Sequence, residues 1–182
     1  ETSASMTQLT LTTAMIGLAA GQLLLGPLSD KFGRKKPLII SLVIYIISTV
    51  LIVFSSNIEM MIVLRVIQGL SSAGSVVISR AIATDLYRGR EMTRFFGLLM
   101  TINGLAPIIS PILGSLLLEY ISWKGVFVFL ALIGVIVLIF SFRLKESLSA
   151  ENRLQGSIFA TFSTFGVIIK NRLFMSYVGI CL

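Results

Sequence analysis

Histidine is absent from the 182 residues, cysteine occurs once, and only eight residues are acidic. The lack of histidine excludes imidazole proton relays and histidine metal ligands, and the single Cys181 excludes an internal disulfide. Charged residues make up 13% of the chain, against about 25% in a typical soluble domain. Hydrophobic residues make up 55%, and the mean hydropathy is +0.97. These values indicate a membrane protein.

Catalytic signatures are also missing from the sequence. It holds no nucleophile–base pair, no metal-ligand cluster and no phosphate-binding loop. We therefore expect neither an enzyme nor a bound cofactor or metal. The net charge of +7 would suggest a nucleic-acid partner for a soluble chain. Here the basic residues mostly fall in short loops between apolar stretches, so membrane topology accounts for them and we expect no nucleic-acid partner.

Five apolar stretches are long enough to span a bilayer, which takes about 20 residues. Backbone groups have no water partner in hydrocarbon, so uninterrupted runs of this length predict helices. The alternating pattern of barrel strands is missing. The sequence therefore predicts an all-α membrane protein. The expected spans are about Leu9–Leu28, Leu38–Phe54, Ile58–Ile82, Phe95–Leu118 and Val126–Phe142, and a sixth begins near Leu173.

The basic residues separate between the two sides of this predicted bundle. If the spans alternate in direction, one side carries thirteen Lys and Arg residues, while the other carries only Lys124. The positive-inside rule then places the basic loops in the cytoplasm and Glu1 outside. Arg65 lies within the third span. The thirteen are Lys31, Arg34, Lys35, Lys36, Arg80, Arg88, Arg90, Arg94, Arg143, Lys145, Arg153, Lys170 and Arg172.

The chain divides into three predicted parts. Residues 1–142 are expected to form a helical bundle that lacks one upstream helix, and residues 173–182 to begin a further span. Residues 143–172 are expected to be a cytoplasmic linker. Its apolar positions predict either an amphipathic helix at the interface or the approach to the next span; they are Ile158, Phe162, Phe165 and Ile169. Residue 1 is Glu and no signal peptide precedes the first span, so we expect an internal piece of a longer protein.

The first loop, Gly26–Lys36, contains glycine, aspartate, glycine and then three consecutive basic residues in a specific order. A tight connection between helices favours a glycine that can take positive φ, and Gly33 can supply it. Asp30 and Arg34 lie four positions apart, within reach of each other if the turn is helical. Asp30 could instead interact with the dipole of a neighbouring helix. The alternative interpretation is a simple positive-inside anchor.

The third span contains a lone guanidinium. An arginine at membrane depth costs roughly 2.5–3.5 kcal/mol on insertion scales, so Arg65 predicts a polar cavity or a partner. A polar stripe follows it at intervals of three and four, made of Gln68, Ser72, Ser75 and Ser79. The serines are also explained by helix packing alone. Three small residues would let a neighbouring helix approach closely; they are Gly69, Ala73 and Gly74.

The fourth span contains two prolines, each of which removes a backbone hydrogen bond and tends to kink a helix. Gly104, Pro107, Pro111 and Gly114 share one face, which predicts a bent and close-packed helix. In the first span, Gly17 and Gly21 have the GxxxG spacing, which we interpret as a helix-packing feature.

These three segments resemble the signature motifs of the major facilitator superfamily, in the order of transmembrane helices 2 to 6 and the start of 7. Gly26–Lys36 resembles the cytoplasmic motif between helices 2 and 3, Leu64–Gly69 the helix 4 motif, and Ala106–Ser115 the helix 5 motif of antiporters. In the last, Ala106, Ser110 and Ser115 stand where glycines are usual. Three further segments resemble the bicyclomycin-resistance (Bcr/CflA) branch of drug–proton antiporters: residues 21–30, 80–85 and 122–127.

The resemblance implies part of a 12-helix bundle in two halves, with a substrate cavity at the midplane. Residues 1–142 would be the N-terminal half without its first helix, and residues 173–182 the start of the C-terminal half. It also implies roles for single residues. A cytoplasmic latch would comprise Gly26, Asp30, Gly33, Arg34, Lys35 and Asp85, with Arg34 near Asp85. Proton coupling and the cavity would involve Arg65, Gln68 and Gly69. The antiporter motif of helix 5 comprises Pro107, Ser110, Pro111 and Gly114. Gln22, Asn103 and Tyr45 are candidate cavity contacts, with ordinary packing as the alternative for each.

The implied protein is a multidrug efflux transporter that exports small drugs in exchange for protons by alternating access. It would be a monomeric, multi-pass protein of the bacterial inner membrane, with drug, protons and lipid as its partners. A metabolite transporter and a non-transporting sensor or scaffold of the same fold are the alternatives. No acidic residue lies deep in a span, so we expect the proton carrier outside this segment, on the missing first helix. The acids are at positions 1, 30, 59, 85, 91, 119, 146 and 151.

Overall fold

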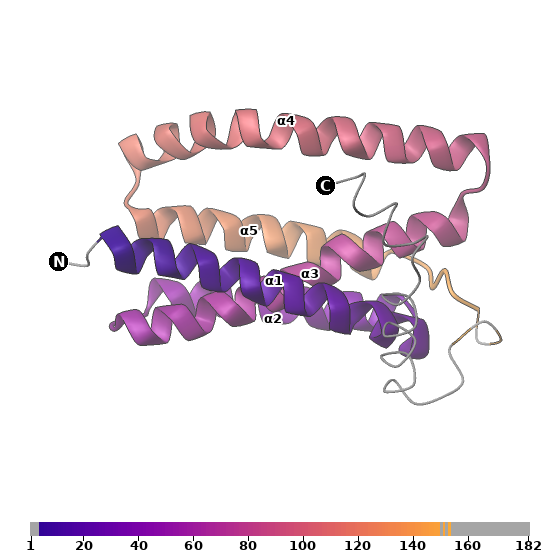
Figure 1. Cartoon of the computed structure of the whole chain (residues 1–182), viewed down its shortest axis with the longest axis horizontal. Helices are drawn as coiled ribbons and strands as arrows, with labels where there is room; N and C mark the ends of the chain where they lie inside the picture. The colour runs from indigo at the N-terminus through magenta and orange to yellow at the C-terminus, as the bar shows by residue number, and fades with distance from the viewer. Residues whose placement is uncertain (1–3, 150, 152, 154–182) are drawn as a thin grey trace, which may run out of the picture.

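The computed structural model describes residues 4–149, 151 and 153, and the regular structure among them is helical. Five helices are each long and apolar enough to cross a membrane; Figure 1 shows how they are arranged. They are α1 (Ala4–Phe32), α2 (Lys35–Val53), α3 (Ile58–Leu86), α4 (Arg90–Tyr120) and α5 (Trp123–Phe142). The predicted all-α class is confirmed. The expected amphipathic helix at 158–169 and the second half at 173–182 lie outside the described residues.

The helices are mostly longer than the apolar runs that predicted them. α3 and α4 extend through polar ends, since α3 continues to Leu86 and α4 begins at Arg90. A helix keeps its own backbone hydrogen bonds when it leaves hydrocarbon, so apolar length sets only a lower bound on helix length. The connection between α1 and α2 is short, and consists of Gly33 and Arg34.

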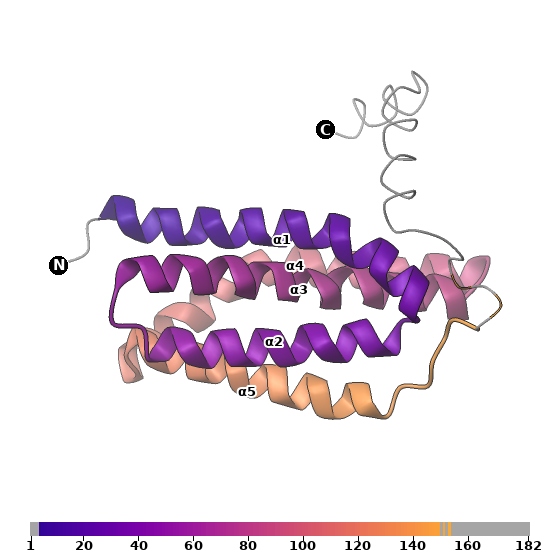
Figure 2. The ribbon, with the colours of Figure 1, turned by 90° about the horizontal axis from the view of Figure 1, so that it is seen from below.

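The connections gather at two ends of the bundle. The start of α1 lies at the same end as the α2–α3 and α4–α5 connections (Figures 1 and 2). The α1–α2 and α3–α4 connections and the segment after α5 lie at the other end. The described basic loops therefore share one end, which we call the basic end, and we call the other the opposite end. This arrangement agrees with the predicted alternation of the spans.

α1 and α3 pack against each other along their length, with their backbones in close approach. A Cβ atom at Gly17 would overlap the Val66 carbonyl, and one at Gly69 would overlap the Ala14 carbonyl. Gly21 faces α3 in the same way. The GxxxG spacing of α1 and the small residues Gly69 and Ala73 of α3 therefore serve the same helix–helix contact, whereas Gly74 lies against Ser41 of α2.

α2 packs against both α3 and α5. Two clusters of buried apolar side chains hold these helices together. Leu38, Leu42 and Ile78 form one toward the basic end. Ile52, Leu64 and Phe127 form the other toward the opposite end. The second cluster lies beside Arg65, whose guanidinium faces the Phe127 ring.

α4 differs from the expectation of a close-packed helix. It runs unbroken through Pro107 and Pro111, and none of its residues is buried. A Cβ atom placed at Gly104 or Gly114 would meet no heavy atom within 4 Å. The reason is that the described helices adjoin α4 mainly at its two ends, next to α3 and α5 (Figure 1). Among the described residues, the face of α4 that carries these glycines and prolines has no packing partner.

Candidate functional site

Arg34 is the centre of a charged cluster at the basic end. Its side chain is largely buried, and the residue is only 8% exposed. Its Nε donates to Asp85 Oδ2 on α3 at 2.9 Å, and its Nη1 donates to Ser29 Oγ on α1 at 2.8 Å. Nη1 also pairs with the carboxylate of Asp30. The expected contact between Arg34 and Asp85 is present, and it joins α3 to the α1–α2 turn.

The local chain positions this guanidinium. Gly33 has a φ of +88°, which lets the chain reverse immediately after α1. Ser29 Oγ donates its proton to the Gly26 carbonyl at 2.8 Å, so it can only accept from Arg34. Burial lowers the pKa of Arg34, but the hydrogen bonds to Asp85 and Asp30 outweigh this effect and raise it overall. Arg34 is therefore a permanent cation held by two acids.

The segment after α5 adds a third acid that the sequence analysis did not single out. Glu146 Oε1 accepts the backbone N–H of Arg34 at 2.7 Å, and its Oε2 accepts that of Lys35 at 3.2 Å. The carboxylate thus satisfies free donors at the start of α2, where a negative charge is stabilising. Burial raises the pKa of Glu146, but the backbone hydrogen bonds from Arg34, Leu148 and Lys35 lower it overall.

Two further contacts hold the same segment in place. Ser147 Oγ donates to Asp85 Oδ2 at 3.1 Å, so Asp85 receives hydrogen bonds from both Arg34 and Ser147. Lys35 Nζ donates to the Phe142 carbonyl at 2.9 Å, near the end of α5. Residues 142–148 therefore belong to the charged cluster rather than forming a free linker at this point.

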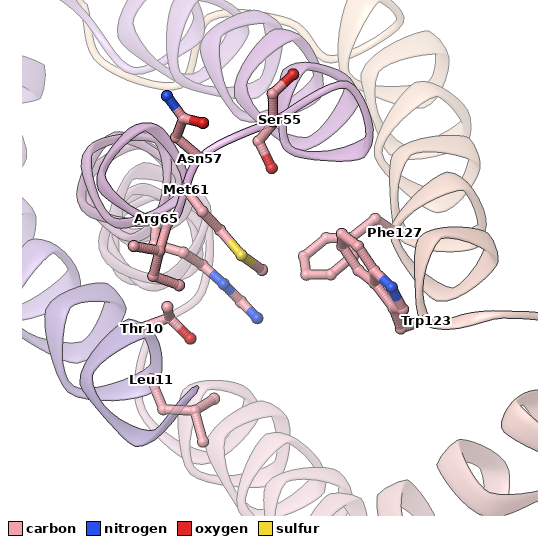
Figure 3. A pocket seen from close by; sticks show the side chains of 10 residues that line it. Thr10, Leu11, Ser55, Asn57, Met61, Arg65, Trp123 and Phe127 are labelled. Carbon is pink, nitrogen blue, oxygen red and sulfur yellow. The ribbon is translucent and has the colours of Figure 1, made fainter. Parts of the chain in front are cut away.

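Arg65 lies near the opposite end and points into a cavity of about 460 Å³ (Figure 3). Its Cζ is 4.7 Å from the centre of the Phe127 ring on α5, a cation–π geometry. Trp123 meets the same ring edge-to-face, with centroids 6.0 Å apart. No acid lines this cavity among the described residues. The lining side chains are Thr10, Leu11, Ser55, Ser56, Asn57, Ile58, Met61, Arg65, Trp123 and Phe127.

A buried polar chain leads from Arg65 to α2. Arg65 Nη1 makes a long contact of 3.4 Å with Gln68 Oε1. Gln68 Nε2 donates to Thr49 Oγ1 at 2.8 Å, and Thr49 Oγ1 donates to the Tyr45 carbonyl at 2.6 Å. Gln68 is 6% exposed and Thr49 is fully buried. Within the described part of the chain, Arg65 Nε is buried and has no hydrogen-bond partner.

Other predicted site residues lie elsewhere. Gly69 lies at the α1–α3 contact. Gln22 and Asn103 are exposed and do not line the cavity of Arg65. Ser110 donates to the Ala106 carbonyl of its own helix at 2.6 Å. Serines of the predicted polar stripe do the same in α3, where Ser72 bonds Gly69 and Ser79 bonds Val76.

The family comparison covers the whole chain. Residues 1–182 match the model of the Major Facilitator Superfamily. The chain belongs to the major facilitator superfamily. Members of this superfamily are multi-pass membrane transporters and not enzymes. The motifs quoted from the sequence therefore lie in the protein class that they indicated.

The relatives within the superfamily include drug-resistance proteins. The chain is 42% identical to the uncharacterized transporter YdgK of Bacillus subtilis, over 96% of this chain and 44% of that protein. It is 36% identical to a chloramphenicol resistance protein of Pseudomonas aeruginosa, over 72% of this chain and 32% of that protein. A bicyclomycin resistance protein homolog of Haemophilus influenzae is 29% identical, over 85% and 39%. The chain thus spans less than half the length of these relatives.

Proposed function

We propose that this chain is part of a transporter that exports small drugs across the bacterial inner membrane in exchange for protons. The observation that carries the proposal is Arg65. Its charged side chain lies in a membrane-spanning helix, is partly buried, and borders a cavity rather than projecting only toward lipid. An arginine at this depth is costly, and such residues mark substrate or ion pathways.

The cavity and the relatives support a drug as the substrate. The cavity combines aromatic and aliphatic surface with a few hydroxyl and amide groups, the usual chemistry of a small-molecule site. Among the relatives are proteins named for resistance to chloramphenicol and bicyclomycin. In transporters built from two halves, the substrate site faces the interface between the halves, where rocking exposes it to alternate sides.

Arg65 supplies the electrostatic part of proton coupling. A nearby cation favours the charged form of an acid and so promotes proton release. No acid lines the cavity within the described residues, and the proposed carrier is therefore a carboxylate on a helix outside this segment. The partly unsatisfied guanidinium would be the group that such a carboxylate faces.

The charged cluster around Arg34 would serve as the cytoplasmic latch of the transport cycle. It connects the α1–α2 turn, the end of α3 and the segment after α5. Arg34 is only 8% exposed, and for ion pairs removed from water the cost of desolvation offsets much of the attraction. A set of individually weak contacts can hold one state and still release it, which is what a gate requires.

A metabolite transporter and a non-transporting sensor or scaffold are the alternatives. A metabolite transporter would have the same helices and a different substrate, so only substrate assays separate it from a drug exporter. A scaffold has no use for a cation in a membrane helix beside a cavity. It would therefore be insensitive to the removal of Arg65.

The test is drug susceptibility of cells that express the full-length protein or its Arg65→Ala variant. The matched control is Arg88→Ala, which removes an exposed arginine outside the spans. We expect Arg65→Ala to abolish resistance to chloramphenicol while Arg88→Ala retains it, with equal amounts of each protein in the membrane fraction. Resistance that survives in Arg65→Ala, or no resistance from the wild-type protein, would overturn the proposal.

A further inference from the structure

The polar chain between α3 and α2 assigns a function to a residue that the proposed mechanism does not use. We propose that Thr49 is a positioning residue that sets the orientation of the Gln68 amide, and through it the place of the Arg65 guanidinium. The inference rests on the proposed function for its transport readout. Its physical basis is the hydrogen-bond geometry alone.

The hydroxyl proton of Thr49 and the amide protons of Gln68 can be placed by counting donors and acceptors. A threonine hydroxyl has one proton to donate, and a backbone carbonyl can only accept. Thr49 Oγ1 lies 2.6 Å from the Tyr45 carbonyl, so its proton is committed there. Toward Gln68, Thr49 can therefore only accept, and it must face the NH₂ group of the amide, at 2.8 Å.

The orientation of the Gln68 amide determines which of its atoms faces Arg65. With its NH₂ group turned to Thr49, Gln68 must present its carbonyl oxygen on the other side. That oxygen lies 3.4 Å from Arg65 Nη1, and it is an acceptor facing a cation. The reversed amide would set NH₂ against the guanidinium, a contact between two donors. It would also set an oxygen against a hydroxyl that has no proton left.

Burial makes the loss of the hydrogen bond between Thr49 and Gln68 costly. Thr49 is fully buried and Gln68 is 6% exposed, so water does not replace a missing partner. A buried donor left unsatisfied carries a desolvation penalty, and buried polar groups are accordingly paired. Without the Thr49 hydroxyl, the Gln68 NH₂ group loses its acceptor and the amide is free to turn. Arg65 then loses its only side-chain acceptor among the described residues.

Four substitutions test this role of Thr49. Thr49→Val keeps the shape and removes the hydroxyl, whereas Thr49→Ser keeps the hydroxyl. Ser48→Ala is the control, because Ser48 is also buried and also donates to the Tyr45 carbonyl, at 3.0 Å, but does not bond Gln68. Gln68→Leu removes the amide itself.

The first measurement is chloramphenicol export by the full-length protein as a function of pH. Thr49→Val and Gln68→Leu are expected to shift the pH profile in the same direction, and the double variant to shift it no further. Thr49→Ser and Ser48→Ala should keep the wild-type profile. A wild-type profile in Thr49→Val, or an equal shift in Ser48→Ala, would overturn the inference.

The second measurement does not need transport. The purified full-length protein is compared with Thr49→Val, Gln68→Leu and the double variant by thermal unfolding. These four proteins form a double-mutant cycle. The double variant should be clearly less destabilised than the sum of the single variants. Additive losses would show that the two side chains act independently and would refute the assignment. If the wild-type protein exports no drug, the proposed function fails, while this cycle still decides the role of Thr49.

Discussion

Gly33→Ala should destabilise the protein through two effects that can be separated. Gly33 has a φ of +88°, where a residue with a Cβ costs roughly 1–2 kcal/mol. The new Cβ would also lie 2.6 Å from Glu146 Oε2, so the carboxylate must move. This movement breaks its two hydrogen bonds to the start of α2, each contributing about 0.5–1.5 kcal/mol. Because Glu146 is exposed, the lower end applies, and the total is roughly 2–3 kcal/mol.

The matched control is Gly89→Ala. Gly89 also has a positive φ, of +56°, but nothing lies within 4 Å of its Cβ position. Its substitution therefore has a backbone effect and no effect on a neighbour. Both substitutions are made in the wild-type protein and in a Glu146→Ala background. The assay is thermal unfolding of the full-length protein in detergent, together with hydrogen exchange at the first amides of α2.

Removal of Glu146 should reduce the loss caused by Gly33→Ala by about 1 kcal/mol, since the two hydrogen bonds are then already gone. The loss caused by Gly89→Ala should be equal in both backgrounds. Faster exchange at the start of α2 is expected for Gly33→Ala and not for Gly89→Ala. The reasoning would be refuted by an undiminished loss from Gly33→Ala in the Glu146→Ala background.

Two further predictions concern the same cluster. Arg34→Asp and Asp85→Arg should each lower drug resistance, and the double variant should restore part of it, because the pair between positions 34 and 85 is rebuilt with reversed charges while the attraction to Asp30 is lost; no rescue would count against the pairing. The pKa of Glu146 is lowered in the folded protein, so its stabilising contribution is complete above the ordinary pKa of a glutamate and is lost as the pH falls through the depressed value. Stability measured from neutral to acidic pH should therefore fall less in Glu146→Gln than in the wild-type protein, and an identical pH dependence would contradict this.

Much of the fold was predictable because lipid imposes a strong rule. Apolar runs of spanning length gave five helices, although their polar ends could not be located from hydropathy. Arg65 stood out because a cation is rare in such a run. The contact between Arg34 and Asp85 came from the family resemblance and is present in the structure. The spacing of residues within Gly26–Lys36 would not have found it, since Asp85 belongs to a different helix.

The remaining features depend on long-range contacts. Glu146 and Ser147 lie in a polar stretch whose partners are more than sixty positions away, so nothing local indicates their contacts. Thr49 resembles any hydroxyl in a membrane helix, and only its position against Gln68 distinguishes it. The face of α4 that carries Gly104, Pro107, Pro111 and Gly114 predicted close packing, but the sequence of one helix does not identify the helix that packs against it. The described helices do not supply one.

The close approach of α1 and α3 has a mechanical consequence. α3 carries Arg65 in its first half and Asp85 at its far end, 20 residues and roughly 30 Å apart along the axis. Because carbonyls of each helix sit against glycines of the other, we expect the pair to resist sliding and to tilt as one unit. A tilt about its middle swings the two ends in opposite directions. A movement at the cavity of Arg65 and a movement at the cluster around Asp85 would then be a single displacement, with no chain of side-chain rearrangements between them.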